Sequence, residues 1–284
     1  MSPKLNSFEK RVRELDEELK GDIGVCVEQH GSGDQWSLRG DEMFPTASSI
    51  KTSILAVLGH YAKKKEVDLK EKIAAPKSVM VGGSGVITDL SPGAEYAVED
   101  LAILMIVISD NTATNMIIDH LGIDAINKQL DEWGMEKTVL HRKVNFKRKP
   151  SDPPLFAEST PNEMTTLLAR IGRRKLLGKK WDGWAEDVLR RQKLRDALPR
   201  YLPDSGSWSG KDRAFTVAHK TGSIDGCRID AGIITSPAGR YSISVFTKNL
   251  KDNRYHADNE GVLAIGKVSR AAYDFLLRRK RSEK

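Results

Sequence analysis

The sequence has few cysteines and no long apolar segment. Its 284 residues include two cysteines, Cys26 and Cys227, so at most one disulfide can form and a scaffold held by several disulfides is excluded. The longest apolar run, Leu101 to Ile108, contains 8 residues, whereas about 20 are needed to cross a bilayer as a helix. We therefore expect a globular protein without a membrane span.

The first 20 residues lack the features of a signal peptide. Met1 to Lys20 is polar and charged, and it contains neither an apolar core segment nor a small-residue cleavage site. Two interpretations are open: the protein is cytosolic, or the chain begins after a removed leader.

Charge is distributed unevenly along the chain. The formal net charge is +7, but residues 1–140 carry −8 and residues 141–284 carry +15. Such a split suggests a basic part that contacts nucleic acid, a membrane or an anionic substrate. The heaviest basic cluster is Arg142 to Lys149. Because the other basic residues are scattered and no aromatic residues are interleaved with them, we do not expect a nucleic-acid partner.

Strands are predicted near both ends of the chain. Their patterns lie at 23–28, around Trp36, at 216–218, at 229–235 and at 241–248. Two isolated strands are marginally stable, so we expect the N-terminal pair to join the C-terminal strands in one antiparallel sheet.

Helices are predicted before, between and after these strands. An amphipathic stripe of Phe8, Val12, Leu15 and Leu19 marks the first, and a closing helix is expected at 261–277. Between them, helices are expected at 47–64, at 98–108, at 112–121 and from Thr160-Pro161 onward, with a long loop at 141–159. The fold class is therefore α/β (α+β): a sheet domain from residues 1–40 plus 205–284, an inserted helical domain from 41–204, and an active site in the cleft between them.

Ser48-Ser49-Ile50-Lys51 is an S-x-x-K motif at the start of a predicted apolar helix. Residues three apart share a helical face, so the Lys51 amine can reach the Ser48 hydroxyl. A hydroxyl needs such a neighbour to accept its proton before it becomes a good nucleophile. Ser7 to Lys10 has the same spacing in a charged helix, so the motif alone does not indicate function.

Two further motifs stand at Ser109-Asp110-Asn111, between two apolar helices, and at Lys220-Thr221-Gly222, at the end of a predicted strand. Alone, the first is compatible with a helix cap and the second with an edge strand before a turn. S-x-x-K, S-D-N and K-T-G in this order are the joint signature of class A β-lactamases and penicillin-binding proteins.

The sequence resembles the class A β-lactamase family over nearly its whole length. The resemblance implies that Ser48 is the nucleophile, that Lys51 helps to deprotonate it, and that Ser109 relays a proton to the leaving nitrogen. Asn111 would bind the substrate side-chain amide, Asp110 would be structural, and Gly222 would keep the strand edge open. Lys220, Thr221 and Ser223 would bind the substrate carboxylate, and the N–H groups of Ser48 and Ser223 would form the oxyanion hole.

Two parts of the family pattern are missing or displaced. The family carries Glu-x-x-Leu-Asn in the loop before Thr-Pro, where the Glu activates the water that hydrolyses the acyl-enzyme. Residues 141–159 do not contain this motif, and their only Glu is Glu158, close to Pro161. Glu158 is therefore either a substitute base or a helix-entry residue favoured by the helix dipole. Arg228 is the nearest candidate for the arginine that faces the substrate carboxylate.

We expect a serine hydrolase that opens β-lactams through a Ser48 acyl-enzyme, with slow deacylation if no base is placed. The alternatives are a D-alanyl-D-alanine peptidase or esterase on the same fold, and a non-catalytic covalent β-lactam sensor. The expected partner is a small β-lactam or cell-wall peptide-like molecule, and we expect a monomer. No cofactor is expected, and no metal site, because the histidines show no ligand spacing. The resemblance implies a periplasmic or secreted protein.

Overall fold

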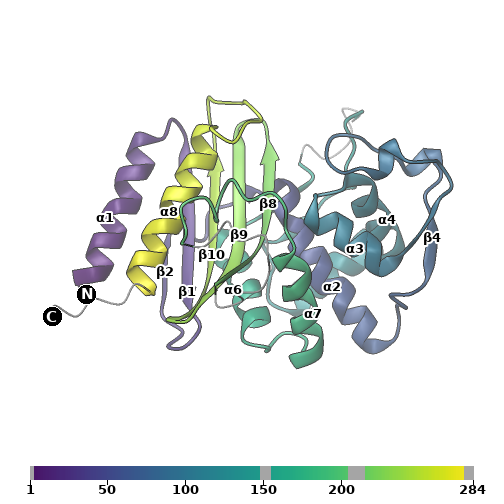
Figure 1. The fold of residues 1–284 in the computed structure, drawn as a ribbon, viewed down its shortest axis with the longest axis horizontal. Coiled ribbons are helices and arrows are strands. Elements are labelled where there is room, and N and C mark those ends of the chain that lie inside the picture. Colours follow the sequence, from purple (N-terminus) through teal and green to yellow (C-terminus); the bar gives the residue numbers. More distant parts are fainter. Residues whose placement is uncertain (1–2, 148–154, 204–214, 278–284) are drawn as a thin grey trace.

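The computed structural model describes residues 3–147, 155–203 and 215–277. A five-stranded sheet forms its centre (Figure 1), in the order β2-β1-β10-β9-β8, and all neighbouring strands are antiparallel. The strands are β1 (Asp22–Gln29), β2 (Gln35–Leu38), β8 (Thr216–Ile224), β9 (Cys227–Ser236) and β10 (Gly239–Lys248). Because β1 pairs with β10, from Asp22 opposite Lys248 to Gln29 opposite Tyr241, the prediction of one sheet built from both chain ends is confirmed.

The two terminal helices, α1 (Pro3–Glu18) and α8 (Glu260–Leu276), lie side by side on one face of this sheet (Figure 1). The predicted stripe of α1 is buried, with Val12 fully enclosed. It packs in one cluster with Val25 of β1 and Val268 of α8. The apolar periodicity of α1 therefore reports its packing on the terminal layer.

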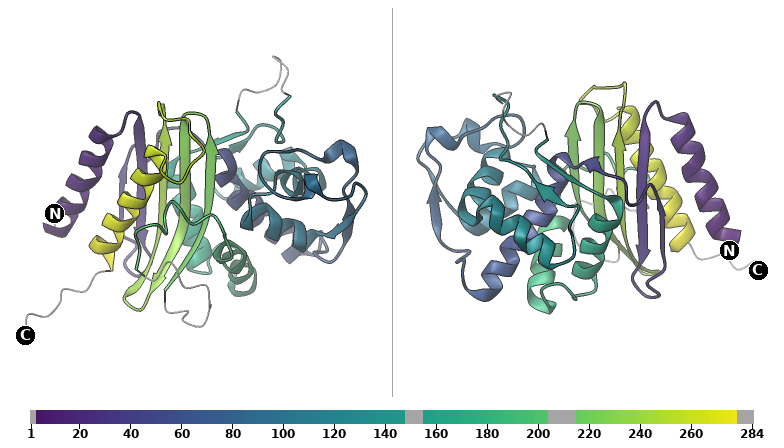
Figure 2. Two further views of the ribbon diagram at one scale, coloured as in Figure 1. Left: turned by 45° about the horizontal axis from the view of Figure 1, so that its top comes forward. Right: turned by 180° about the vertical axis from the view of Figure 1, so that it is seen from behind.

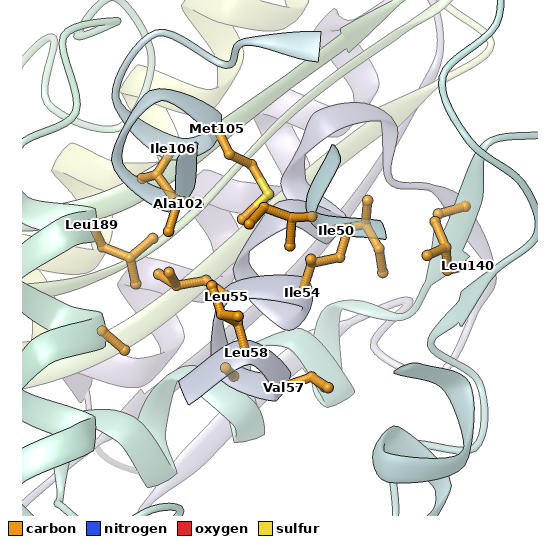
Figure 3. Packing of buried hydrophobic residues seen from close by; sticks show 14 of the residues in the cluster. Ile50, Ile54, Leu55, Val57, Leu58, Ala102, Met105, Ile106, Leu140 and Leu189 are labelled. Carbon is orange, nitrogen blue, oxygen red and sulfur yellow. The ribbon is translucent and has the colours of Figure 1, made fainter. Parts of the chain in front are cut away.

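The middle of the chain covers the opposite face of the sheet, as the two further views in Figure 2 show. Its helices are α2 (Lys51–Lys64), α3 (Val98–Val107), α4 (Asn111–Leu121), α5 (Ile123–Glu132), α6 (Pro161–Gly172) and α7 (Lys179–Arg190). Figure 3 shows Ile54 and Leu55 of α2 packed among Met105, Ile106 and Leu189 of the neighbouring helices.

This second core is shared between the sheet and the helices. Ala231 of β9 and Phe246 of β10 belong to the same buried cluster as Leu55. Truncating such a buried leucine to alanine typically costs about 2–5 kcal/mol. The predicted division at residues 40 and 204 stays a prediction, and residues 205–214 of the sheet domain lie outside the described part of the chain.

Helices α5 and α7 and several short elements were not predicted. Two small sheets contain β3 (Phe44–Pro45), β7 (Ala157–Ser159) and β6 (Val139–Leu140), and β4 (Lys72–Ala74) with β5 (Glu95–Ala97). The 3-10 turns are η1 (Ala47–Ile50), η2 (Lys77–Val79) and η3 (Ile87–Asp89). The predicted helix 47–64 thus begins with a 3-10 turn, and the end of the predicted 141–159 loop is strand β7. Two or three residues are too few to show a periodic pattern.

Neither a membrane helix nor a disulfide is seen in the described residues. None of these helices combines the length and the apolarity needed to cross a membrane. Cys26 and Cys227 are both buried and free. Burial raises the pKa of the Cys26 thiol to about 11, so this thiol stays protonated at neutral pH.

Candidate active site

The three sequence motifs meet at one pocket of about 310 Å³ beside the edge strand β8. Ser48 of η1, Ser109 before α4, and Thr221, Gly222 and Ser223 of β8 all line it. These residues are separated by up to 175 positions in the chain, and the packing of β8 and β9 on η1, together with that of α4 on α2, brings them together. The S-x-x-K sequence at Ser7 lies instead on α1, on the other face of the sheet.

Ser48 stands at the second position of η1 and is half-buried. The preceding residue, Ala47, has a φ of 45°, a conformation that is uncommon for a residue with a side chain and that marks stored backbone strain. Lys51 follows at the first position of α2, so Ser48 and Lys51 lie on either side of the junction between a 3-10 turn and an α-helix. The predicted contact of the Lys51 amine with the Ser48 hydroxyl stays a prediction.

Lys51 is fully buried and its ammonium group has three hydrogen-bond acceptors. Its Nζ lies 2.8 Å from the carbonyl oxygen of Ser109, 3.1 Å from Ser109 Oγ and 2.9 Å from Asn111 Oδ1. Burial lowers the pKa of Lys51 well below its ordinary value, and the positive charge of Lys220 lowers it further. Such surroundings favour the neutral amine, which is the form that can accept a proton from a neighbour.

Lys220 is also fully buried, in β8, where its Nζ donates to the carbonyl oxygen of Thr221 at 2.8 Å. Burial lowers the pKa of Lys220 to about 7, against the opposing attraction of the Asp230 carboxylate. Two lysines with lowered pKa values thus flank the pocket. Such clustering of perturbed groups is typical of functional sites.

Asp110 and Asn111 have different structural tasks. Asp110 caps α4 by accepting from the Ala113 N–H, and its second oxygen accepts from the N–H groups of Val86 and Ile87. Asn111 Oδ1 accepts from Lys51, while its Nδ2 donates to the carbonyl oxygen of Gly82 at 3.0 Å. Asp110 therefore ties residues 86 and 87 to α4, as expected of a structural residue, and Asn111 faces Lys51.

Gly222 is explained by close packing of backbone. A Cβ at this position would lie 2.4 Å from the carbonyl oxygen of Thr46 and 3.2 Å from the Ser48 nitrogen. We expected this glycine to keep the strand edge open to a ligand. Gly222 does line the pocket, but its missing side chain also lets β8 approach the backbone that carries Ser48.

Glu158 is not among the described residues that line the Ser48 pocket. It lies in β7, opposite Pro45 and Val139, and its Oε1 is 2.9 Å from His141 Nε2. The structure thus joins Glu158 to His141 and does not bring it to the other motif residues. Neither is it an N-terminal helix residue, because Thr160 caps α6.

Arg228 does line the pocket, on β9 opposite Ser223. Its guanidinium donates to the carbonyl oxygens of Ile224, Cys227 and Arg254, at 2.6, 2.7 and 2.6 Å. Three of its five N–H donors are therefore committed to backbone. The side chain is buried and lies 4.8 Å from the ring centroid of Tyr255, so it braces this end of the sheet.

Two pairs near the pocket were not predicted. His219 Nδ1 lies 2.9 Å from the Asp230 carboxylate, and both side chains are fully buried. Asn115 holds Val144 on both backbone groups: it donates to the carbonyl oxygen at 2.9 Å and accepts from the N–H at 2.8 Å. Asn115 stands four residues after Asn111, a spacing that places both on one helical face. The His219–Asp230 contact joins the neighbouring strands β8 and β9, and no short-range sequence pattern predicts it.

The described residues contain no group of three His, Cys, Asp or Glu side chains that could hold a metal ion.

Comparison with known proteins covers nearly the whole chain. The sequence model of the beta-lactamase enzyme family matches residues 7–276. The β-lactamase SME-1 of Serratia marcescens is 25% identical over 285 residues, which cover 95% of this chain and 89% of that protein.

Two solved structures show the same fold at 30% sequence identity. The β-lactamase of Sphaerobacter thermophilus has a TM-score of 0.84 and covers 95% of this chain and 96% of its own. A variant of PBP-A, solved as an acyl-enzyme complex with penicillin G, has a TM-score of 0.80 and covers 96% and 98%. Together with the fold and the three converging motifs, these matches show that the chain belongs to the beta-lactamase enzyme family, as a serine hydrolase of the class A type.

Proposed function

We propose that Ser48 attacks the carbonyl carbon of a β-lactam and forms an acyl-enzyme. The Ser48 hydroxyl proton passes to neutral Lys51 Nζ as the Oγ–C bond forms. The ring C–N bond then breaks, and the leaving nitrogen takes a proton through Ser109 Oγ, which is replenished from Lys51. The product is a ring-opened ester on Ser48. This proposal rests above all on the buried Lys51 amine, which bonds Ser109 Oγ and has a lowered pKa.

The remaining motif residues suit substrate binding. The N–H groups of Ser48 and Ser223 would stabilise the oxyanion. Thr221 and Ser223 would donate hydroxyl hydrogen bonds to the ring carboxylate, and protonated Lys220 would attract it. Asn111 Nδ2 has one N–H beyond its bond to Gly82, which can hold the substrate side-chain amide.

We propose that the acyl-enzyme is long-lived. Hydrolysis of the ester needs a base that activates a water. Among the described residues that line the pocket, the one carboxylate is Asp196. Glu158 is bonded to His141, and Val144, whose backbone is held by Asn115, lines the neighbouring pocket. The described residues therefore include the groups proposed for acylation, and none of the described residues of the 141–159 loop brings a carboxylate to the Ser48 pocket.

A D-alanyl-D-alanine peptidase or small-ester hydrolase is the second candidate. Its support is the likeness to PBP-A, a variant of which is trapped with penicillin G. A covalent β-lactam sensor would use the same acylation step. All three functions imply a small β-lactam or cell-wall peptide-like partner, and we propose a periplasmic or secreted protein because cell-wall substrates are found there.

Incubation with a chromogenic cephalosporin, followed by intact mass measurement, tests the proposal. We expect one adduct in wild type, no adduct in Ser48→Ala, and slow colour release relative to adduct formation. Rapid colour release without an accumulated adduct would contradict slow deacylation, and neither colour nor adduct would overturn acylation. Turnover of D-alanyl-D-alanine peptides, with β-lactams acting only as inhibitors, would favour the second candidate.

A further inference from the structure

A second pocket, of about 710 Å³, lies next to the Ser48 pocket. It is lined by residues 78–82, by Asn115 and Asp119 of α4, and by residues 142–147. Gly82 lines this pocket, whereas Ser84 lines the Ser48 pocket. The short segment 82–84 therefore forms a wall between the two.

The wall is one backbone thick at Gly83. This residue has a φ of 91°, and a Cβ here would lie 2.9 Å from Phe146 Cζ and 3.0 Å from Asn111 Nδ2. The Phe146 ring and the Asn111 amide thus meet over Gly83. Because Asn111 also bonds Lys51 and Gly82, one side chain connects the buried lysine to the second pocket.

The second pocket combines positive charge with an exposed aromatic ring. Arg142, Lys143 and Lys147 line it together with one acid, Asp119, whose carboxylate is 2.7 Å from Lys143 Nζ. These four groups leave a net charge of two positive units. Phe146 is 70% exposed. A cationic wall with an apolar surface favours ligands that join an apolar chain to an anion.

The loop that carries these groups is braced. Asn115 holds Val144 on both sides, Arg142 Nη1 donates to the carbonyl oxygen of Lys143 at 3.1 Å, and the Lys147 N–H donates to Asn145 Oδ1 at 2.8 Å. The cations are thus presented on a preorganised segment, which reduces the entropy lost on binding.

We propose that this second pocket, which we name the acyl pocket, binds the acyl chain of the Ser48 substrate and selects apolar chains that end in a carboxylate. The inference rests on the proposed function, in which Asn111 holds the amide at the start of that chain. From Asn111 the chain would run along the exposed face of the Phe146 ring and place its carboxylate near Lys147 and Lys143.

Two penicillins that differ only at the chain end test this inference. One carries an adipoyl side chain, which ends in a carboxylate, and the other a hexanoyl chain of equal length. The second-order rate of Ser48 acylation is measured for both by intact mass. We expect wild type to prefer the adipoyl compound by about threefold to tenfold at low salt, and the preference to shrink at high salt.

The double variant Lys143→Gln/Lys147→Gln should reduce this preference to within about twofold while leaving the hexanoyl rate unchanged. Lys63→Gln/Lys64→Gln makes the same charge change at the end of α2, and it should keep the preference. Phe146→Ala should slow both compounds by about threefold because both chains lie on the ring.

Equal rates for the two penicillins in wild type would overturn the acyl pocket alone, because Ser48 would still be acylated. A preference that survives in Lys143→Gln/Lys147→Gln would overturn it too. Absence of any adduct with either compound would overturn both the acyl pocket and the proposed function.

Discussion

The two sides of the Ser48 site differ. On the side of Lys51 the polar side chains are buried and hydrogen-bonded to one another, and on the side of the 141–159 loop the described polar side chains bond to residues other than Ser48. Lys51, Ser109 and Asn111 form a closed hydrogen-bonded group. The loop side offers Val144, which Asn115 holds only by its backbone, and Glu158, which bonds His141. Among the described residues, the groups proposed to form the ester are therefore bonded to one another, whereas Glu158, the candidate base from the sequence, is bonded elsewhere.

The largest expected effect is on the rate of acylation when the Lys51 amine is removed. Lys51→Met should slow acylation by about 10²–10⁴-fold, the usual contribution of a placed proton acceptor. The rate is measured by intact mass with a penicillin. Lys10→Met, at an exposed position of α1 in the second S-x-x-K sequence, is the matched control and should acylate as wild type. Rapid acylation of Lys51→Met would assign the proton to another group.

A carboxylate introduced on the loop side should speed the hydrolysis of the acyl-enzyme. Val144→Glu places a carboxylic acid at the loop residue whose backbone is held by Asn115, and Asn115 lies one helical turn after Asn111 on α4. We expect the acyl-enzyme lifetime to fall by about tenfold to a hundredfold. The lifetime is followed by loss of the adduct mass. Adding Asn115→Ala should remove the gain, since the clamp is lost. An unchanged lifetime in Val144→Glu would contradict this position for a base.

The charge of Lys220 should make acylation depend on pH. Its pKa of about 7 means that the ammonium is present below that pH and lost above it. The rate at which a penicillin with a free ring carboxylate acylates Ser48 should therefore decline as pH rises through about 7. Because the Asp230 carboxylate raises this pKa, Asp230→Asn should move the decline to lower pH.

The control for that profile is the methyl ester of the same penicillin, which has no ring carboxylate and should not show the decline. Near-ultraviolet circular dichroism confirms that Asp230→Asn is folded, since the variant also disturbs His219. A decline that moves to higher pH, or one that is equal for the ester, would remove Lys220 from carboxylate binding.

The smallest effect is expected at Glu158. Because its carboxylate is bonded to His141 and does not line the Ser48 pocket, Glu158→Gln should leave the acyl-enzyme lifetime within about twofold of wild type. The same adduct-decay measurement applies. A lifetime at least about tenfold longer would restore Glu158 as the base and remove the contrast between the two sides.

The sequence by itself determined the family, the sheet built from both chain ends, the three motifs and the helices other than α5 and α7. The elements and motifs have local signals: the stripe of α1, the β-branched and aromatic residues of β10, or three residues at fixed spacing. The structural role of Asp110 was also implied, because caps are local.

Only the tertiary structure decided what surrounds those residues. The low pKa of Lys51 comes from burial between α2 and α4, and the need for Gly222 comes from β8 packing on η1. The hydrogen bond of Glu158 to His141, the His219–Asp230 pair and the Asn115 clamp join elements that no short-range pattern connects. Spacing fixes which side chains share a turn or a strand face, whereas burial, charge and contact between elements depend on how the whole chain packs.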